Sequence, residues 1–318
     1  MKAVVLRQPG STAHFEYMDV PTPVIRPGWS LVKIKGFGIN RSEIFTREGK
    51  SPSVRFPRIL GIECVGVVHE TSDAQRLPVG AKVVSIMGEM GRAFDGSYAE
   101  YCLLPNEQIY PIASDLPWRL LAAIPETYYT AYGSLQNLRI EEKDTVLVRG
   151  ATSGVGVAFA KLLKALFPSV QVYGSSRSSE KRALLLAAGF DGMIEDREGI
   201  LQTDQSFDKV LELIGPATIK NSFAHIREGG IICVTGLLGG VWELQQFDPI
   251  MEIKNNSYLT SFHSGEVSGE KLAEVIKLIE AKKVDATPEM IFALADVGKA
   301  HDYLQSADSF GKVIVLNE

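Results

Sequence analysis

The sequence predicts an α/β protein with a β-rich domain towards its N-terminal end and a parallel, doubly wound sheet after it. Three observations lead to this fold class. The chain has 318 residues, which is room for about two domains and a large core. Before residue 110, short β-like runs are separated by proline and glycine. After Thr145, strand-like and helix-like segments alternate, as a parallel sheet requires because each parallel pairing needs a crossover connection.

The residue pattern places the individual elements. In the first part we expect strands at residues 3–6, 30–35, 64–69, 82–86 and 97–103, then a helix at 116–131 that Pro125 interrupts. In the second part we expect strands at 145–148, 170–173, 192–194, 209–214, 231–235 and 257–262, and helices at 157–166, 181–188 and 217–226. An amphipathic helix at 270–281 and a strand at 313–316 follow, and we expect this last part to return to the N-terminal domain.

The composition excludes several classes of protein. Apolar residues make up 45% of the chain and charged residues 22%, as in ordinary globular proteins. A net charge of −5 without a basic run argues against nucleic-acid binding. No apolar run is long enough to span a membrane, and residues 1–6 are too short for a secretory signal. Because the three cysteines (Cys64, Cys102 and Cys233) are scattered and odd in number, we expect reduced thiols and a cytoplasmic protein.

Residues 145–158 are typical of a nucleotide-binding strand–turn–helix unit. The first helical N–H groups have no partner of their own and carry partial positive charge, so a pyrophosphate fits there. The usual fingerprint is G-x-G-x-x-G, whereas residues 151–156 are ATSGVG, which keeps only the last glycine. An ordinary glycine-containing turn is therefore the alternative. The predicted cofactor-binding residues here are Ser153, Gly154, Val155 and Gly156.

Several further stretches carry a family resemblance. They are GINRSE at 38–43, FPRILGIE at 56–63, GSYAEY at 96–101, TAY at 130–132, GLLGG at 236–240 and GKV at 311–313. Together with the glycine turn they resemble the medium-chain dehydrogenase/reductase superfamily, in particular its zinc-independent quinone oxidoreductase branch. The resemblance implies a Rossmann domain and a GroES-like β-barrel substrate domain with a cleft between them. The implied domains are residues 1–122 (GroES-like, first part), 123–260 (Rossmann) and 261–318 (return segment).

The resemblance also bears on metal binding. Zinc alcohol dehydrogenases of this superfamily carry cysteine where Asn40 stands and histidine where Ile62 stands, and neither an amide nor an isoleucine is a useful zinc ligand. Residues 88–96 contain no cysteine, so the structural zinc lobe is missing too. The five histidines show no ligand clustering. We therefore predict no metal, even though the family name 'zinc-binding dehydrogenase' can be applied to this chain by resemblance alone.

The run after the second Rossmann strand indicates the coenzyme. NAD enzymes place an acid there to accept a hydrogen bond from the ribose 2′-hydroxyl, and here Ser176 takes its place. The hydroxyls of Ser175 and Ser176 and the cations of Arg177 and Lys181 would suit a 2′-phosphate, so we predict NADPH. A solvated loop and helix start is the alternative. Asp196 stands where the quinone oxidoreductase branch often has a tyrosine near the adenine ribose.

The nicotinamide end is assigned by the resemblance. It implies contacts from Thr130, Leu213, Gly236 and Leu237, with Phe262 as a wall of the ring site. Each has a structural alternative: a helical threonine bonded to the preceding turn, a loop after a strand, or a core phenylalanine.

The predicted reaction is hydride transfer from NADPH to a quinone or similar electron-poor carbonyl compound, without zinc. Candidate acceptor-side residues are Asn40 as hydrogen-bond donor, Glu43 and Arg47 ordering the loop beside it, and Tyr128 or Tyr129 as further donors, although each can equally be structural. Alternatives are an alkenal or enone double-bond reductase and an NADPH-binding protein with little turnover. Family analogy implies a homodimer that pairs edge strands within 232–262.

Overall fold

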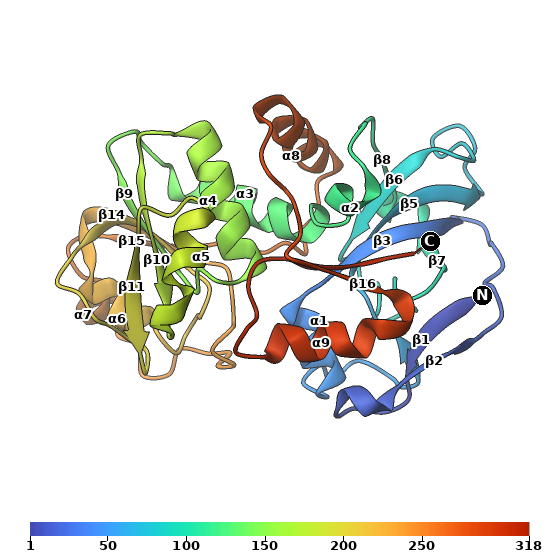
Figure 1. Ribbon diagram of the computed structural model, residues 1–318, viewed down its shortest axis with the longest axis horizontal. Helices are drawn as coiled ribbons and strands as arrows, with labels where there is room; N and C mark the ends of the chain where they lie inside the picture. Colours follow the sequence, from blue (N-terminus) through green and yellow to red (C-terminus); the bar gives the residue numbers. More distant parts are fainter. Residues whose placement is uncertain (318) are drawn as a thin grey trace. The chain divides into compact units, whose positions relative to one another are not determined.

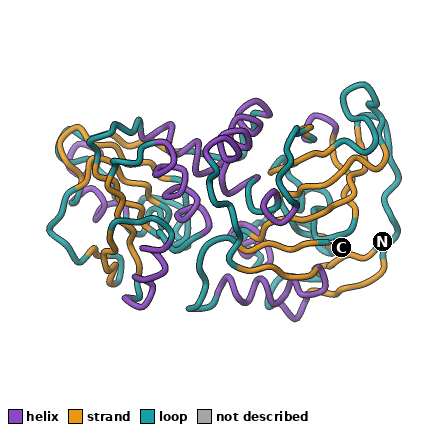
Figure 2. The backbone as a smooth tube through the Cα atoms, turned by 45° about the horizontal axis from the view of Figure 1, so that its top comes forward, coloured by secondary structure: helices purple, strands orange, loops and turns teal. Residues whose placement is uncertain are grey.

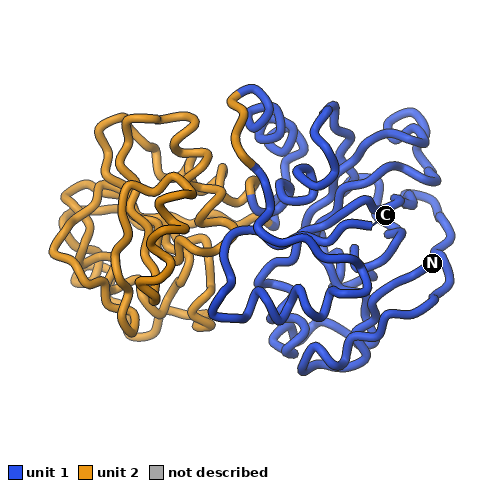
Figure 3. Tube along the Cα trace, viewed as in Figure 1, with its two compact units in different colours: residues 1–127, 265–281, 286–318 blue, residues 128–264, 282–285 orange. Residues whose placement is uncertain are grey.

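The computed structural model describes residues 1–317 and divides into two compact units. Unit 1 consists of residues 1–127 and 265–281 and of the described residues from 286 onward, whereas unit 2 consists of residues 128–264 and 282–285 (Figure 3). The predicted domains, 1–122, 123–260 and 261–318, stay a prediction, and the last residue of the third lies outside the described part.

Unit 2 is built on a seven-stranded sheet with the order β12-β11-β10-β9-β13-β14-β15. All neighbours are parallel except β12, which runs antiparallel to β11. β9 is buried at every position, as expected for a strand covered on both faces. The strands are β9 (Thr145–Arg149), β10 (Gln171–Ser176), β11 (Gly192–Arg197), β12 (Ile200–Leu201), β13 (Phe207–Glu212), β14 (Ile226–Val234) and β15 (Tyr258–Ser261). This arrangement confirms the predicted doubly wound sheet.

Helices cover both faces of this sheet (Figure 1). Ile219 and Phe223 of α6 (Ile219–Ala224) pack against Leu147 of β9 and Val210 of β13 on one face. On α4 (Gly154–Leu166) the predicted apolar stripe is buried, which confirms the helix expected at 157–166. The remaining helices are α3 (Pro125–Leu138), α5 (Arg182–Ala187), which follows the 3-10 turn η3 (Ser179–Lys181), and α7 (Pro249–Glu252).

Unit 1 is dominated by strands, drawn orange in Figure 2. A three-stranded sheet has the order β2-β1-β4, and a larger sheet has the order β16-β17-β3-β5-β6-β8, with β7 also paired to β3. One apolar core, which includes Phe37 and Tyr98, joins them. The strands are β1 (Lys2–Leu6), β2 (Phe15–Asp19), β3 (Trp29–Ile39), β4 (Arg58–Ile59), β5 (Glu63–Glu70), β6 (Lys82–Ile86), β7 (Tyr101–Pro105), β8 (Tyr110–Pro111), β16 (Met290–Ala293) and β17 (Val313–Leu316).

Most of the late part of the chain belongs to unit 1, whereas residues 282–285 belong to unit 2. Strand β17 pairs antiparallel with β3, with Val313 opposite Ile39. The helices of this unit are α1 (Arg41–Arg47), α2 (Trp118–Leu121), α8 (Gly269–Lys282) and α9 (Val297–Gln305), with 3-10 turns η1 (Thr12–His14), η2 (Asn106–Gln108) and η4 (Leu294–Asp296). No helix within residues 1–317 is long and apolar enough to cross a membrane. All three cysteines are buried and free.

Three predicted elements need correction. The single helix expected at 116–131 is two helices, and Pro125 begins α3 rather than interrupting a helix, because the missing proline N–H costs nothing in a first turn. The strand expected at 97–103 begins only at Tyr101. The helix expected at 217–226 ends at Ala224, and β14 already begins at Ile226, because Phe207 of β13 pairs with it there.

Two glycines in helices give opposite expectations for the same substitution. A Cβ on Gly133 of α3 would lie 2.0 Å from Cε2 of the Phe262 ring, whereas a Cβ on Gly298 of α9 would meet nothing closer than 3.7 Å. We expect Gly133→Ala to lower the free energy of unfolding by about 1–3 kcal/mol through overpacking. We expect Gly298→Ala to raise it by up to about 1 kcal/mol, since alanine is the better helix former. Urea unfolding measures both, and equal stabilisation by the two changes would contradict the close packing of Phe262.

Candidate functional site

The predicted coenzyme residues of unit 2 gather at one edge of its sheet. The carboxyl ends of parallel strands meet at the same edge, which is where open α/β sheets bind ligands. Here β9 ends at Arg149, β10 at Ser176 and β13 at Glu212. The residues predicted from the sequence follow these strands and β14, or lie on α3 and after β15: Thr130, Ser153, Gly154, Val155, Gly156, Ser175, Ser176, Arg177, Lys181, Leu213, Gly236, Leu237 and Phe262.

The glycine turn presents backbone rather than side chains. Gly150 has φ 81°, in the left-handed region. The hydroxyl of Ser153 accepts a hydrogen bond from the Gly156 N–H (3.1 Å) and donates one to the Gly150 carbonyl (2.8 Å), so it caps α4 and is already used. The N–H groups of Gly154 and Val155, in the first turn, have no acceptor within the helix. An anion at this turn would therefore be met by backbone amides.

Ser175 and Ser176, at the end of β10, were expected to bind a 2′-phosphate through their hydroxyls, but both hydroxyls already bond to backbone groups. Ser175 is buried, and its Oγ accepts a hydrogen bond from the Gly150 N–H (3.2 Å). The Ser176 hydroxyl donates to the Ser178 carbonyl (3.0 Å) and accepts from the Ser178 N–H (3.2 Å). Both hydroxyls thus shape the backbone of the edge. The side chains of exposed Arg177 and half-buried Lys181, by contrast, make no ion pair or hydrogen bond within residues 1–317.

A buried ionic network that the sequence reasoning missed underlies this edge. Arg149 has no exposed surface. Its Nε donates to Asp196 Oδ2 (2.8 Å), its Nη1 to the Thr218 carbonyl and to Ser222 Oγ (both 3.0 Å), and its Nη2 to the Gly199 carbonyl (2.6 Å). The guanidinium therefore joins β9, β11 and the start of α6. The sequence signal that could have revealed this network is Arg149 itself, a charged residue at the end of the apolar strand β9.

Glu212 completes the network from β13. Its Oε1 accepts hydrogen bonds from the N–H groups of Ile214 (2.8 Å) and Gly215 (3.1 Å), and its Oε2 accepts one from the Ser222 hydroxyl (2.5 Å). Burial raises the pKa of Glu212, while Arg149 and these donors oppose the rise. The carboxylate fixes the loop that follows β13, in which Leu213 is a predicted coenzyme residue.

The residues predicted at the nicotinamide end are closely packed. A Cβ on Gly236 would lie 2.2 Å from the Leu213 carbonyl oxygen, so only glycine fits there. Thr130 is buried on α3, and its carbonyl accepts a hydrogen bond from the Ser134 hydroxyl (2.8 Å). The ring of half-buried Phe262 packs on Tyr129, with centroids 5.9 Å apart.

Tyr128 is buried, and its hydroxyl is engaged within unit 2. The hydroxyl donates to the Asp285 carbonyl (3.2 Å). Burial also raises the pKa of Tyr128. As placed here, this hydroxyl holds the segment at 285 to α3, which is the structural role weighed for it above.

Unit 1 contains a second buried polar cluster, here called the Asn40 cluster, made of Asn40, Glu43, Glu63 and Lys312. Lys312 Nζ donates to Asn40 Oδ1 and to Glu63 Oε1 (both 2.7 Å). Asn40 Nδ2 donates to Glu63 Oε1 (2.9 Å) and lies 3.5 Å from Glu43 Oε1. The topology explains the meeting, because Asn40 follows the end of β3 and Lys312 precedes the start of β17, its antiparallel neighbour. The Asn40 amide is thus fully engaged.

Glycine makes room for the Asn40 cluster. A Cβ on Gly38 would lie 2.2 Å from Glu63 Oε1 and 2.3 Å from Lys312 Nζ. The other carboxylate oxygen of Glu63 accepts a hydrogen bond from the Glu126 N–H (2.8 Å). Glu63 therefore connects β5 to the start of α3 as well as to β17.

The charges of the Asn40 cluster balance only if Glu43 is protonated. Lys312 and Glu63 form an ion pair with side chains 7% and 0% exposed. Glu43 is buried too, and its Oε2 has no hydrogen-bond partner in the described chain. Burial and then the neighbouring Glu63 raise the pKa of Glu43 to about 8, against the opposing charge of Lys312. At neutral pH the cluster is therefore neutral overall.

Arg47, the third acceptor-side residue predicted in unit 1, contacts residues outside the Asn40 cluster. It is buried, and its Nη2 donates to Gln305 Oε1 of α9 (2.5 Å) and lies 3.4 Å from Glu48 Oε1. Arg47 thus fixes the end of α1. The start of α1 is held by Arg92, whose Nη2 donates to Ser42 Oγ (2.8 Å) and brings the loop at 87–94 against the helix.

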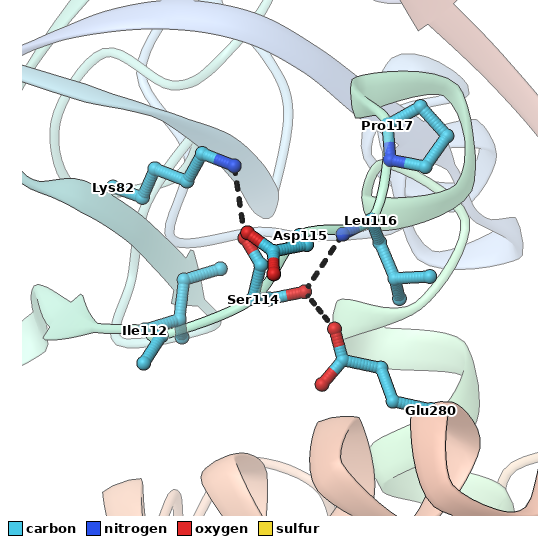
Figure 4. A pocket seen from close by; sticks show the side chains of 8 residues that line it. Lys82, Ile112, Ser114, Asp115, Leu116, Pro117 and Glu280 are labelled. Carbon is cyan, nitrogen blue, oxygen red and sulfur yellow. Dashed lines mark hydrogen bonds between the residues drawn. The ribbon is translucent and has the colours of Figure 1, made fainter.

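A pocket of about 780 Å³ lies elsewhere in unit 1 (Figure 4). Two of its ionisable groups, Lys82 and Glu280, already have partners: Lys82 Nζ donates to the Ser114 carbonyl (2.8 Å), and the Ser114 hydroxyl donates to Glu280 Oε1 (2.6 Å). The pocket contains none of the predicted site residues. Its polar contacts hold the segment before α2 to α8.

The protonation of Glu43 has a measurable consequence. Folding raises its pKa, so the folded protein keeps a proton that the unfolded chain releases, and the free energy of unfolding falls as the pH rises from about 4.5 to about 8. Glu43→Gln removes this penalty. We expect the variant to gain stability over the native protein across that window, by roughly a few kcal/mol at its upper end, in urea unfolding at several pH values.

Glu63→Gln is the matched control, because it leaves Lys312 buried without its carboxylate. It should destabilise the protein at every pH, by about 3–5 kcal/mol. A pH-independent effect of Glu43→Gln would show that Glu43 is ionised in the folded state.

Two known protein families match parts of this chain. The model of the family described as alcohol dehydrogenase GroES-like domain matches residues 26–114, all of them in unit 1. The model of the family described as zinc-binding dehydrogenase matches residues 188–315. Within residues 1–317 no group of three or more histidine, cysteine, aspartate or glutamate side chains is arranged to hold a metal ion.

Whole-chain relatives extend these matches. Quinone oxidoreductase from Rattus norvegicus is 26% identical over 314 residues, which cover 94% of this chain and 92% of the rat protein. A thermostable alcohol dehydrogenase from Pyrobaculum aerophilum superposes with a TM-score of 0.86 at 25% identity, covering 100% of this chain and 99% of that one. The yhdH oxidoreductase from Salmonella enterica, solved in complex with NADP, gives 0.85 at 21% identity over the full length of both chains.

Both family models and the relatives thus agree with the two sheets and with the motifs of the sequence. These findings support the medium-chain dehydrogenase/reductase superfamily of oxidoreductases, and within it the quinone oxidoreductase-like branch, as the family of this chain.

Proposed function

We propose that this protein is an NADPH-dependent reductase that transfers hydride to quinones or similar electron-poor carbonyl compounds without zinc. The observation that carries the proposal is the coenzyme edge of unit 2. There the amides that begin α4 are available to a pyrophosphate, and Arg177 and Lys181 are cations without a protein partner. The NADP complex of the Salmonella enterica protein supports the same choice. Bound NADPH would supply the hydride.

The chemistry of the Asn40 cluster supports the proposal that zinc takes no part. The ammonium of Lys312 contacts two oxygens that a cation could otherwise use, Asn40 Oδ1 and Glu63 Oε1, at 2.7 Å. A divalent metal would have to displace this buried positive charge. The groups present are an amide, an ammonium and two carboxyl groups, without histidine or cysteine, and they do not make up the three or four ligands that a zinc site needs.

The acceptor side is proposed on Asn40, Glu43, Arg47 and Tyr128. One observation favours a second candidate function, an NADPH-binding protein with little turnover: the Asn40 amide and the Tyr128 hydroxyl both already donate to protein acceptors. Reduction of an alkenal or enone is the third reading. These functions differ in turnover, so assays separate them.

The test combines binding and turnover. We expect NADPH to bind at least about tenfold more tightly than NADH, because the unpaired cations meet a 2′-phosphate, and we expect 1,4-naphthoquinone to support NADPH oxidation without added zinc. Calorimetric titration with NADPH, NADH and zinc, followed by assays with naphthoquinone and a short alkenal, measures this. Tight NADPH binding with turnover of neither acceptor would favour the binding protein, and turnover of the alkenal alone would favour the double-bond reductase.

A double variant locates the coenzyme contact in the same experiment. Arg177→Ala with Lys181→Ala should weaken NADPH binding by roughly ten- to a hundredfold and leave NADH nearly unchanged. Lys143→Ala is the control, because its side chain is 86% exposed and precedes β9, at the opposite edge of the sheet. Equal losses for both coenzymes would place the 2′-phosphate elsewhere.

The proposed homodimer rests on β15, the edge strand of the sheet in unit 2. An exposed edge strand can pair with a second copy, and Tyr258 is 63% and Leu259 37% exposed on it. We expect light scattering to give about twice the chain mass of 34.8 kDa, and Leu259→Lys to give monomers because it places a charge on the edge. Val24→Lys in unit 1, which also changes an exposed apolar residue, should leave the dimer intact. A monomeric native protein would contradict the proposal.

A further inference from the structure

A carboxylate stands close to the proposed 2′-phosphate site. β10 and β11 are parallel neighbours, and Ser176 pairs with Glu195. Asp196 is the next residue of β11, so its backbone lies about one strand spacing, roughly 5 Å, from the end of β10 that leads into Arg177. Its side chain is 8% exposed. An acid near this place in a Rossmann sheet favours the unphosphorylated coenzyme, because it accepts from the 2′-hydroxyl and repels a 2′-phosphate.

Arg149 neutralises this carboxylate from two strands away. β10 lies between β9 and β11, so the guanidinium crosses β10 to reach Asp196 Oδ2 at 2.8 Å. Its other donors are held by the Thr218 and Gly199 carbonyls and by Ser222 Oγ. With this many fixed acceptors, the cation cannot follow a ligand and stays beside Asp196. The neighbouring acid on the strand, Glu195, is paired with Arg197 (3.1 Å).

We propose that Arg149 is a specificity-determining positioning residue, which keeps the coenzyme edge open to a 2′-phosphate by pairing with Asp196. This inference rests on the proposed NADPH dependence. The inference adds that the choice of coenzyme depends on a buried residue that touches no coenzyme, as well as on the side chains of Arg177 and Lys181. Without Arg149, Asp196 would present an unpaired negative charge beside Arg177.

The test measures the ratio of the NADPH and NADH dissociation constants by fluorescence titration. Arg149→Met should lower the NADPH preference by about tenfold or more, with NADH affected less. Arg149→Met with Asp196→Asn should restore the preference, because the unpaired charge is gone. Arg149→Lys should retain it. A merely structural role predicts that Arg149→Met loses equal affinity for both coenzymes and that the double variant does not recover the NADPH preference. That result would overturn the inference.

Asp196→Asn alone keeps the inference testable if Arg149→Met does not fold. A carboxylate that Arg149 already neutralises contributes little to the choice, so the ratio should stay within about twofold of the native value. A tenfold or larger gain in NADPH preference would overturn the inference, since Asp196 would then repel the phosphate in spite of Arg149. The native protein is the separate control for the proposed function: if it binds NADPH no better than NADH, that function fails and this inference with it.

Discussion

Arg149 has no exposed surface, so its positive charge and its donors must all be satisfied inside unit 2. That requirement fixes Asp196 at the end of β11, the Gly199 carbonyl beyond it and the first residues of α6. The strand that carries Arg149 leads directly into the glycine turn. The buried charge of Arg149 therefore holds the loops at this edge of the sheet in place, beside the first turn of α4 and the side chains of Arg177 and Lys181.

Unit 1 solves a similar problem with different residues. Two buried carboxyl groups, Glu43 and Glu63, face one buried ammonium, Lys312. Close approach is possible because Gly38 has no side chain, and the Asn40 amide links the groups. In both units buried charge is compensated by hydrogen bonds from residues far apart in the sequence. These clusters can therefore form only when the strands that carry the residues have come together.

The alternation of strands and helices and the apolar stripe of α4 were sufficient to predict the sheet of unit 2. The late strand at 313–316 was predicted too, whereas the domain bounds stay a prediction. Local signals were less reliable where one residue has two possible roles. Pro125 can end or begin a helix, and only the packing decides. For the candidate site, the sequence named residues that the structure brings to one edge of the sheet, but it did not predict what each side chain contacts. Ser153, Ser175 and Ser176 have the residue types of a coenzyme site, yet their hydroxyls bond to nearby backbone groups. The structural roles of Arg149 and Glu212 were not predicted, because these roles depend on Asp196 and Ser222, which are 47 and 10 residues away along the chain.

The contribution of β17 to unit 1 has a consequence for biosynthesis. When residue 285 leaves the ribosome, unit 2 has its entire complement of residues, whereas unit 1 still lacks β16, α9 and β17. Domains fold as units during synthesis, so the nucleotide-binding half can be complete while Glu43 and Glu63 have no counter-ion. The nascent chain must keep that carboxylate pair hydrated until Lys312 arrives, and the polar cluster therefore closes as one of the last events of folding.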